Sequence, residues 1–288
     1  MIAVVVLTFD APAGMLEDCL ASLREADPQH LHPVIVVDNG TRTAELPPEL
    51  FTGVRLVRNP TNTGYAGGMN TGIREARALG ADVVVLLNDD VTVTPGWTEP
   101  LSAEMAADER AGAVQPKLLS WPDATVVNSM GVRLGRDGAG VDIGHGQPDV
   151  GFDEPATIEA FTGGAVMLRM AMLDDVGIFD ERYFLYYEDV DLALRASERG
   201  WHHRVAPASV VQHRGSASMG GVGHLAIRLR ERNRLWVLFR HRPAGDVARG
   251  LWLSTRRLRW APRTVHASAL AAGLAAAPRL LAARFRQG

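Results

Sequence analysis

The chain has 288 residues, of which 47% are apolar, 22% are charged and one is a cysteine. This composition excludes a disordered, collagen-like or coiled-coil chain, and it excludes an internal disulfide or a cysteine metal cluster. The net charge of −3 is unevenly distributed along the chain. Residues 1–200 hold 14 basic and 31 acidic residues, whereas residues 201–288 hold 16 arginines and two acids. This distribution predicts an acidic N-terminal part that binds a cation and a basic C-terminal tail that meets phosphates or a membrane surface.

Hydrophobic patterning over the first ninety residues predicts alternating strands and helices. Short β-branched runs typical of buried strands lie at 2–8, 34–37, 54–57 and 83–87, and helical stripes lie at 16–23 and 69–79. Farther along, the pattern predicts helices at 99–108, 171–176 and 190–199, and strands at 165–168, 205–206 and 210–211. This order favours an α/β fold with a mainly parallel, doubly wound sheet and helices on both faces.

Polar side chains gather where the predicted strands end. They are Asp10 after the first strand, Asp38 and Asn39 after the second, and Asn88, Asp89 and Asp90 after the fourth. In an open parallel sheet, ligands bind at the edge formed by the carboxyl ends of the strands, although a single acid at that edge can also be a helix cap. Crowded carboxylates repel each other and favour a cation, and oxygen ligands suit Mg²⁺ or Mn²⁺ together with a phosphate. The edge is therefore predicted to hold a metal-bearing diphosphate.

Three further signals lie outside the strand ends. Gly64–Gly68 leads into a predicted helix, where the backbone either approaches an anion closely or forms a tight loop. The pair Glu188-Asp189 stands at the start of another helix behind four aromatic residues, which suits a general base, although acids also complement a helix N-terminus. His213 ends the last predicted strand and is either structural or a ligand.

Five co-linear segments together resemble the family 2 inverting glycosyltransferases, and most closely their bacterial rhamnosyltransferase-like branch. The segments are residues 36–40, 62–72, 86–90, 161–165 and 179–195, and the resemblance extends from about residue 3 to residue 236. It implies a GT-A fold, a nucleotide-sugar donor and a divalent metal, Mn²⁺ or Mg²⁺.

The resemblance also implies roles for individual residues. Asp189 matches the general base, the second acid of the family's Glu-Asp pair, with Glu188 beside it. Asn88-Asp89-Asp90 matches the metal-binding DXD position with Asn as its first residue, so Asp90 is the implied metal ligand, together with His213. The implied donor-binding residues are Thr8, Asp10, Asp38, Asn39, Asn62, Gly64, Tyr65, Asn70, Asn88, Asp89 and Gly164, among which Asp38 reads the nucleotide base. Arg232 or Arg234, in a segment that resembles one following that histidine, is a candidate contact for a diphosphate.

Taken together, the resemblance predicts transfer of a sugar from a dTDP- or UDP-linked donor to an acceptor hydroxyl, with dTDP-rhamnose implied by the branch. The acceptor is expected to be a lipid-linked cell-envelope glycan intermediate or a small secondary metabolite, and no nucleic acid partner is expected. One alternative is a sugar nucleotidyltransferase, which would need a Gly-rich, Arg-containing loop that residues 9–16 lack. Another is a non-catalytic membrane-surface scaffold, against which the presence of Asp90 and Asp189 argues.

The chain is expected to have two parts. Residues 1–223 would form the GT-A domain, with a donor half at about 1–98 and an acceptor half at about 99–223, and residues 224–288 would form an Arg-rich helical extension. Because the extension interleaves arginine with leucine and tryptophan, it predicts either a peripheral contact with the cytoplasmic face of a membrane or helices packed on the domain. No apolar run is expected to approach the roughly 20 residues that cross a bilayer.

Overall fold

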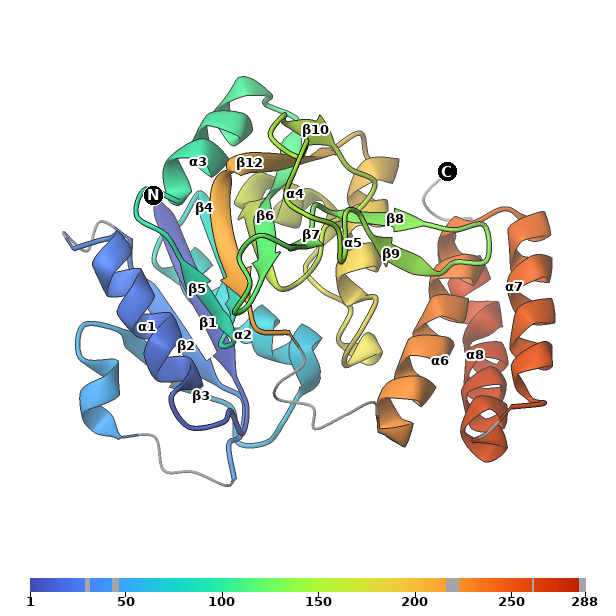
Figure 1. Cartoon of the computed structure of the whole chain (residues 1–288). Coiled ribbons are helices and arrows are strands. Elements are labelled where there is room, and N and C mark those ends of the chain that lie inside the picture. The colour runs from blue at the N-terminus through green and yellow to red at the C-terminus, as the bar shows by residue number, and fades with distance from the viewer. Residues whose placement is uncertain (29–31, 43–46, 216–222, 261, 285–288) are drawn as a thin grey trace.

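A mixed β-sheet with helices on both faces forms the centre of the molecule, and three C-terminal helices lie beside it (Figure 1). The computed structural model describes residues 1–28, 32–42, 47–215, 223–260 and 262–284. In spatial order the main strands are β10 (Ala156–Thr157), β12 (His202–His213), β6 (Ala111–Ser120), β11 (Ala165–Arg169), β4 (Val83–Asn88), β1 (Ile2–Thr8), β2 (Val34–Asp38) and β3 (Arg55–Arg58). The short strands β5 (Val91–Val93) and β7 (Val127–Ser129) pair with β12 and β6.

The N-terminal part of the sheet is parallel, as predicted. Strands β4, β1, β2 and β3 run in one direction, and their register pairs Thr8 with Asp38 and Leu7 with Asn88. The predicted strand-end residues therefore share one edge of the sheet. Strand β11 is antiparallel to both β4 and β6, so it begins at this same edge, where the Asn88 amide donates a hydrogen bond to the Gly164 carbonyl over 3.1 Å.

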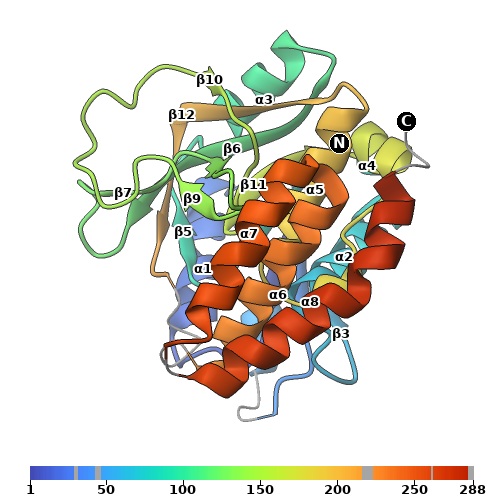
Figure 2. The same ribbon diagram turned by 90° about the vertical axis from the view of Figure 1, so that its right-hand side faces the viewer.

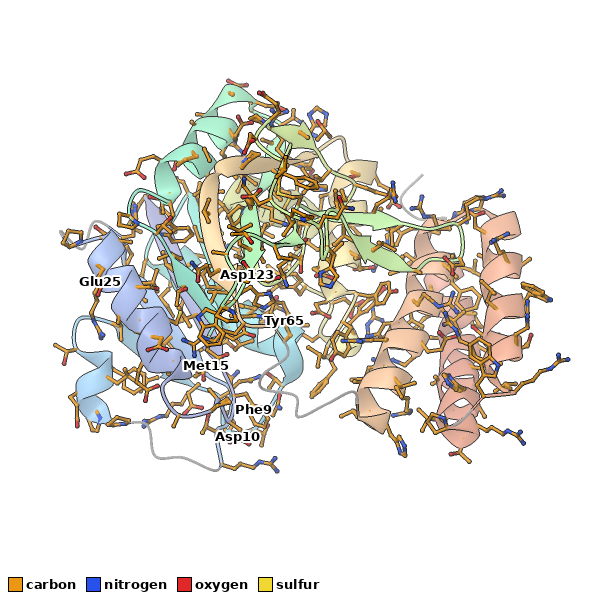
Figure 3. All side chains as sticks on the ribbon, in the orientation of Figure 1. Phe9, Asp10, Met15, Glu25, Tyr65 and Asp123 are labelled. Carbon is orange, nitrogen blue, oxygen red and sulfur yellow. The ribbon has the colours of Figure 1, made fainter. Side chains whose placement is uncertain are left out.

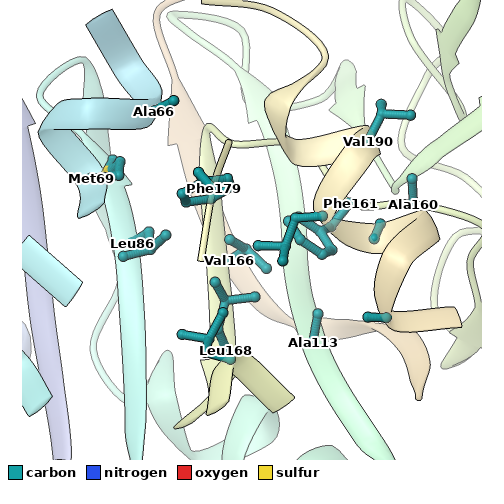
Figure 4. Close-up of a cluster of buried hydrophobic side chains, with 14 of the residues drawn as sticks. Ala66, Met69, Leu86, Ala113, Ala160, Phe161, Val166, Leu168, Phe179 and Val190 are labelled. Atoms are coloured by element: carbon teal, nitrogen blue, oxygen red, sulfur yellow. The ribbon is translucent and has the colours of Figure 1, made fainter. Parts of the chain in front are cut away.

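The central strands β1, β2, β4 and β11 are apolar along most of their length because both faces of the sheet are covered there. In β1, Ala3, Val5 and Leu7 face one hydrophobic cluster, whereas Val4 and Val6 face the other. The first cluster packs against α2 (Gly64–Ala78), α4 (Met170–Val176) and α5 (Glu188–Glu198), and part of it is shown in Figure 4. The second packs against α1 (Met15–Ala26) and α3 (Thr98–Ala107).

The glycine-rich run lies inside a helix rather than before it, because α2 begins at Gly64. A Cβ atom at Gly68 would lie 2.4 Å from a Leu7 methyl carbon, and one at Gly72 would lie 2.2 Å from a Val5 methyl carbon. These two glycines therefore allow α2 to pack closely on β1. The short strands predicted at 205–206 and 210–211 are both present, but they belong to one longer strand, β12, which passes through an irregularity between Ala206 and Val210. The hairpin of β8 (Val132–Leu134) and β9 (Gly140–Asp142) was not predicted.

The C-terminal segment forms the helices α6 (His224–His241), α7 (Ala244–Arg257) and α8 (Arg263–Arg284), which lie side by side in Figure 2. Helix α6 packs on the first hydrophobic cluster through Leu235, Val237 and Leu238, and α8 packs along α6. Residues 285–288 of the predicted extension lie outside the described residues.

Helix α8 is long and apolar enough to cross a membrane by length and composition, with a mean hydropathy of 1.3 in its most apolar stretch. The sequence-based expectation that no segment approaches this length was therefore wrong. Small alanine side chains account for most of the apolar residues of α8, so the stretch does not read as a run of large apolar residues. Only 22% of that stretch is buried.

Candidate active site

A cleft of 370 Å³, here called the Asp90 cleft, opens at the shared edge where β1, β2 and β4 end. Its polar lining includes six of the predicted donor-binding residues: Asn39, Asn62, Gly64, Tyr65, Asn88 and Asp89. Phe9, Phe184, Leu185 and Leu225 add apolar walls. Figure 3 shows Phe9, Asp10 and Tyr65 on this edge of the sheet. The parallel register thus brings together residues that are far apart in the sequence.

Other predicted donor residues lie beside this cleft. Asp38 is buried at the end of β2, and its Oδ1 accepts a hydrogen bond of 2.9 Å from the Thr41 amide. Asp10 adopts a left-handed φ of 47°, and its Oδ1 accepts a hydrogen bond of 2.7 Å from the Arg42 amide. Thr8 is buried at the end of β1.

The structure does not bring Asn70 into the cleft. Its side-chain amide donates to the Phe179 carbonyl at 2.9 Å and accepts from the Phe179 amide at 3.1 Å, and the side chain is buried. Asn70 therefore ties α2 to the segment that leads into α5. The prediction that it binds the donor is replaced by this structural role, which fits an amide that satisfies two backbone groups in the interior.

Asp90 and His213 form a pair at the inner end of the cleft. Strand β12 pairs with β5 so that His213 lies opposite Val91, and His213 Nε2 is 3.2 Å from Asp90 Oδ1. Asp90 Oδ1 is nevertheless buried without a hydrogen-bond partner among the described residues. The other ring nitrogen, Nδ1, is 3.0 Å from Asn128 Oδ1. With Nδ1 directed at the Asn128 oxygen, Nε2 is the ring nitrogen that faces Asp90 and is placed to bind a cation beside it.

This donor set fits a divalent cation that takes its remaining ligands from a phosphate and water. The orphaned buried carboxylate oxygen and the oriented imidazole supply two protein ligands, which is the number that a metal shared with a diphosphate commonly has. Within the described ranges, no three His, Cys, Asp or Glu side chains form a group that could hold a metal by themselves. Burial raises the pKa of the neighbouring Asp89 to about 7.

A second cleft of 530 Å³, the Asp189 cleft, lies on the other side of this pair. His213 lines it, and so do Thr162, Tyr186, Tyr187, Asp189 and Arg230. Gly164 lies at the boundary, because a Cβ atom there would be 3.5 Å from the His213 ring. The two clefts therefore meet where Asp90 and His213 lie side by side.

The Asp189 carboxylate is held by the backbone. Its Oδ2 accepts a hydrogen bond of 2.9 Å from the Gly163 amide, and its Oδ1 accepts one of 2.8 Å from the amide of Val190. Burial raises the pKa of Asp189 to about 6, and burial beside Asp189 raises the pKa of Glu188 well above its usual range. With a pKa of about 6, Asp189 is mainly ionised near neutral pH, and it is the member of the pair that faces a cleft.

The loop before this pair is strained. Phe184, Tyr186 and Tyr187 all adopt positive φ angles of 68–71°, a region that non-glycine residues rarely occupy and that costs about 1–3 kcal/mol for each residue. Helix α6 holds this loop through Asn233, whose Nδ2 donates to the carbonyls of Leu185 at 2.9 Å and Tyr186 at 2.7 Å. Asn233 and the His213 partner Asn128 are supporting residues that sequence reasoning missed.

The two arginines proposed from the sequence as diphosphate contacts do not reach the Asp90 cleft. Arg232 donates to the Tyr183 carbonyl at 2.8 Å. Arg234 is buried and pairs with Glu231 at 2.8 Å, and it also donates to Ser254 at 2.6 Å. Both guanidinium groups therefore join α6 to its neighbours, and neither lines the Asp90 cleft.

Comparison with known proteins identifies the family and the fold of the chain. The family model described as "Glycosyl transferase family 2" matches residues 3–125, and the model described as "Glycosyl transferase family group 2" matches residues 83–278. The N-acetylglucosaminyl-diphospho-decaprenol L-rhamnosyltransferase of Mycobacterium tuberculosis is 30% identical over 250 residues, which cover 78% of this chain and 80% of that protein.

Two solved structures share the fold. The structure of GalNAc-T7 with UDP, GalNAc and Mn²⁺ matches with a TM-score of 0.69 at 14% identity, covering 93% of this chain and 54% of that one, so this chain spans about half of its length. The mannosyltransferase PcManGT from Pyrobaculum calidifontis, in complex with GDP-Man and Mn²⁺, matches with a TM-score of 0.56 at 21% identity, covering 98% and 78%. The predicted GT-A fold is confirmed, and the chain belongs to glycosyltransferase family 2.

Proposed function

We propose that this protein is an inverting glycosyltransferase that moves L-rhamnose from dTDP-rhamnose to a hydroxyl group of a lipid-linked sugar diphosphate. The meeting of the two clefts at Asp90 and His213 is the observation that carries the proposal, because it leaves room for a nucleotide sugar on one side and an acceptor on the other. The rhamnosyltransferase relative, whose name gives a diphospho-decaprenol sugar as acceptor, supports the donor and acceptor classes.

In this proposal Asp189 is the general base. Its carboxylate takes the proton from an acceptor hydroxyl in the Asp189 cleft, and the hydroxyl oxygen forms a bond to the anomeric carbon of the donor sugar. The bond between that carbon and the diphosphate oxygen breaks, the electron pair leaves with the nucleoside diphosphate, and the configuration is inverted. Asn39, Asn62 and Asn88 would hold the donor with the other polar residues of the Asp90 cleft.

Asp90 and His213 would hold a divalent cation, which when bound neutralises negative charge on the diphosphate. We propose Mn²⁺ in preference to Mg²⁺, because one ligand is an imidazole nitrogen and Mg²⁺ prefers an all-oxygen shell. Structures of the same fold contain Mn²⁺, which supports this choice.

Replacing Asp90 with Ala is expected to weaken Mn²⁺-dependent binding of dTDP by about 10–100-fold, because it removes the buried carboxylate ligand. Isothermal titration with dTDP, in Mn²⁺, in Mg²⁺ and in EDTA, measures the effect. Glu17→Ala, which removes an exposed acid on α1, is the matched control. Equal affinity of the wild-type protein for dTDP with Mn²⁺ and with EDTA would contradict the proposed metal site.

We further propose that α7 and the segment after it rest on an anionic membrane surface, where a lipid-linked acceptor resides. Trp252 is 54% exposed and Trp260 is 65% exposed, and Arg256 lies over the Trp252 ring at 4.8 Å. Residues 247–288 contain no acidic residue. Exposed tryptophan beside arginine suits the boundary between lipid headgroups and acyl chains.

The double variant Trp252→Ser/Trp260→Ser is expected to lose most of its binding to vesicles that contain an anionic phospholipid, since both large apolar contacts disappear. Flotation at low and high salt measures the bound fraction, and salt should release the wild-type protein because each basic residue contributes about 1 kcal/mol at such a surface. Trp121→Ser removes another exposed tryptophan, outside the helical segment, and serves as control. Wild-type protein that stays unbound at low salt would exclude this contact.

A further inference from the structure

A third cavity, here called the Arg230 pocket, lies between the C-terminal helices and the Asp189 cleft. It measures 260 Å³, and its lining includes Tyr187, Arg230, Glu231, Arg234, Arg257 and His266. Tyr187 and Arg230 also line the Asp189 cleft. The two cavities are therefore adjacent and share these side chains.

The pocket carries an excess of positive charge. Three arginines line it together with a single carboxylate, Glu231. Glu231 is buried and is paired with Arg234 and Arg257, and the Ser254 hydroxyl donates to it at 2.5 Å. One carboxylate neutralises only one of its two arginine partners. Because Arg234 directs its other donors at Ser254 and at backbone carbonyls, Arg257 is the member of this cluster that retains donors for a ligand.

Arg230 is oriented without being neutralised. Its guanidinium lies over the Tyr186 ring at 4.3 Å from the ring centre, and the side chain lines both cavities. No carboxylate pairs with it in the described part of the chain. The pocket also contains His266, whose Nδ1 is buried with no hydrogen-bond partner in those same residues. Arginine forks and a free imidazole nitrogen are the groups that recognise a phosphate.

We propose that the Arg230 pocket binds the diphosphate of the acceptor, with Arg230, Arg257 and His266 as the contacting side chains. This inference rests on the proposed function, which places the sugar of the acceptor in the Asp189 cleft with one hydroxyl at Asp189. The diphosphate is attached at the other end of that sugar and passes between Tyr187 and Arg230 into the pocket. The lipid that follows then leaves beside α7 and α8, the helices proposed to meet the membrane.

Geranyl diphosphate is the probe, since it has the diphosphate and a short prenyl chain but no nucleotide and no sugar. Isothermal titration of the full-length protein in EDTA, which keeps a metal from recruiting the probe to Asp90, measures its affinity. Arg230→Gln and Arg257→Gln are each expected to weaken binding by about 10-fold, the effect of losing a charge-assisted hydrogen bond. Arg228→Gln is the matched control, because Arg228 is an exposed arginine on α6 that does not line the pocket.

Inorganic pyrophosphate is expected to displace the probe and geraniol is not, because the diphosphate is the recognised group. Equal binding of the probe by the wild-type protein and by Arg230→Gln would overturn the proposal, and so would displacement by geraniol. Arg230 is exposed, and its replacement leaves the ion pairs of Glu231 intact. The Arg230→Gln variant therefore tests the proposed diphosphate site even if Arg257→Gln unfolds.

The same protein samples are titrated with dTDP and Mn²⁺. Retained dTDP binding by Arg230→Gln and Arg257→Gln would show that the loss is confined to the pocket. Absence of dTDP binding by the wild-type protein would count against the proposed function, whereas the dependence of geranyl diphosphate binding on Arg230 would still decide the inference about the pocket.

Discussion

Replacing Asp189 with Asn is expected to lower the rate of sugar transfer by about 10²–10⁴-fold, because the amide cannot accept the proton of the acceptor hydroxyl. The substitution is nearly isosteric, and the side-chain oxygen of Asn can still accept a hydrogen bond from the Gly163 amide or the Val190 amide. Affinity for the nucleotide donor should therefore stay close to that of the wild-type protein. Transfer is measured with a lipid-diphosphate-linked acceptor sugar, and donor affinity by titration.

The matched control is Glu188→Gln. Since Glu188 is buried and does not line the Asp189 cleft, a glutamine of the same shape should lower the transfer rate much less than Asp189→Asn. A second readout is the pH profile. The base must be ionised, and its pKa is raised to about 6, so wild-type transfer should persist above that pH and decline as the pH falls through it. Near wild-type transfer by Asp189→Asn would show that another group takes the proton.

Much of the candidate site could be predicted because its residues follow strands that are easy to recognise. β-Branched runs identify β1, β2 and β4, and parallel strands end at one edge, so the polar residues after them had to lie close together. The pairing of Asp90 with His213 depends on the contact between β5 and β12, which are far apart in the sequence. Strand β5 has only three residues, which is too short for a recognisable hydrophobic pattern. Its pairing with β12 could therefore not be predicted, and only the family resemblance placed Asp90 and His213 at one metal.

The supporting residues could not be predicted, because their partners come from distant parts of the chain. Asn233 lies in a helix whose sequence is rich in arginine, and nothing nearby indicates that its amide holds the carbonyls of a left-handed loop about fifty residues earlier. Arg234 was noticed for its charge, yet charge alone does not distinguish a phosphate ligand from the buried partner of Glu231. Asn70 is predicted to bind the donor because it lies in a segment that resembles the family's donor site. In the structure its side chain instead points from α2 to the Phe179 carbonyl.

Asp191 is the third acid at the start of α5, and the structure gives it a role that differs from those of Glu188 and Asp189. It is fully buried, its Oδ2 is 2.9 Å from Arg195, and its Oδ1 is 3.1 Å from Arg240 and 3.0 Å from His241. Burial acts to raise the pKa of Asp191, but Arg195, His241 and Arg240 together bring it well below its usual range. Asp191 therefore links α5 to α6 through an ionised network, away from the two clefts.

Replacing Asp191 with Asn is expected to destabilise the fold by about 3–5 kcal/mol, because buried Arg195 loses its negative partner and Arg240 keeps only the more distant Asp180, at 3.8 Å. The lowered pKa means that this stabilisation is present above the pKa of the unfolded chain and is lost as the pH falls, so the effect should be full at pH 7. Thermal unfolding at pH 7 measures it, with an expected decrease in Tm of about 10 °C. Glu198→Gln, which removes a partly exposed partner of His241 at the other end of the network, should change stability by less than about 1 kcal/mol. An unchanged Tm in Asp191→Asn would mean that the network adds no stability.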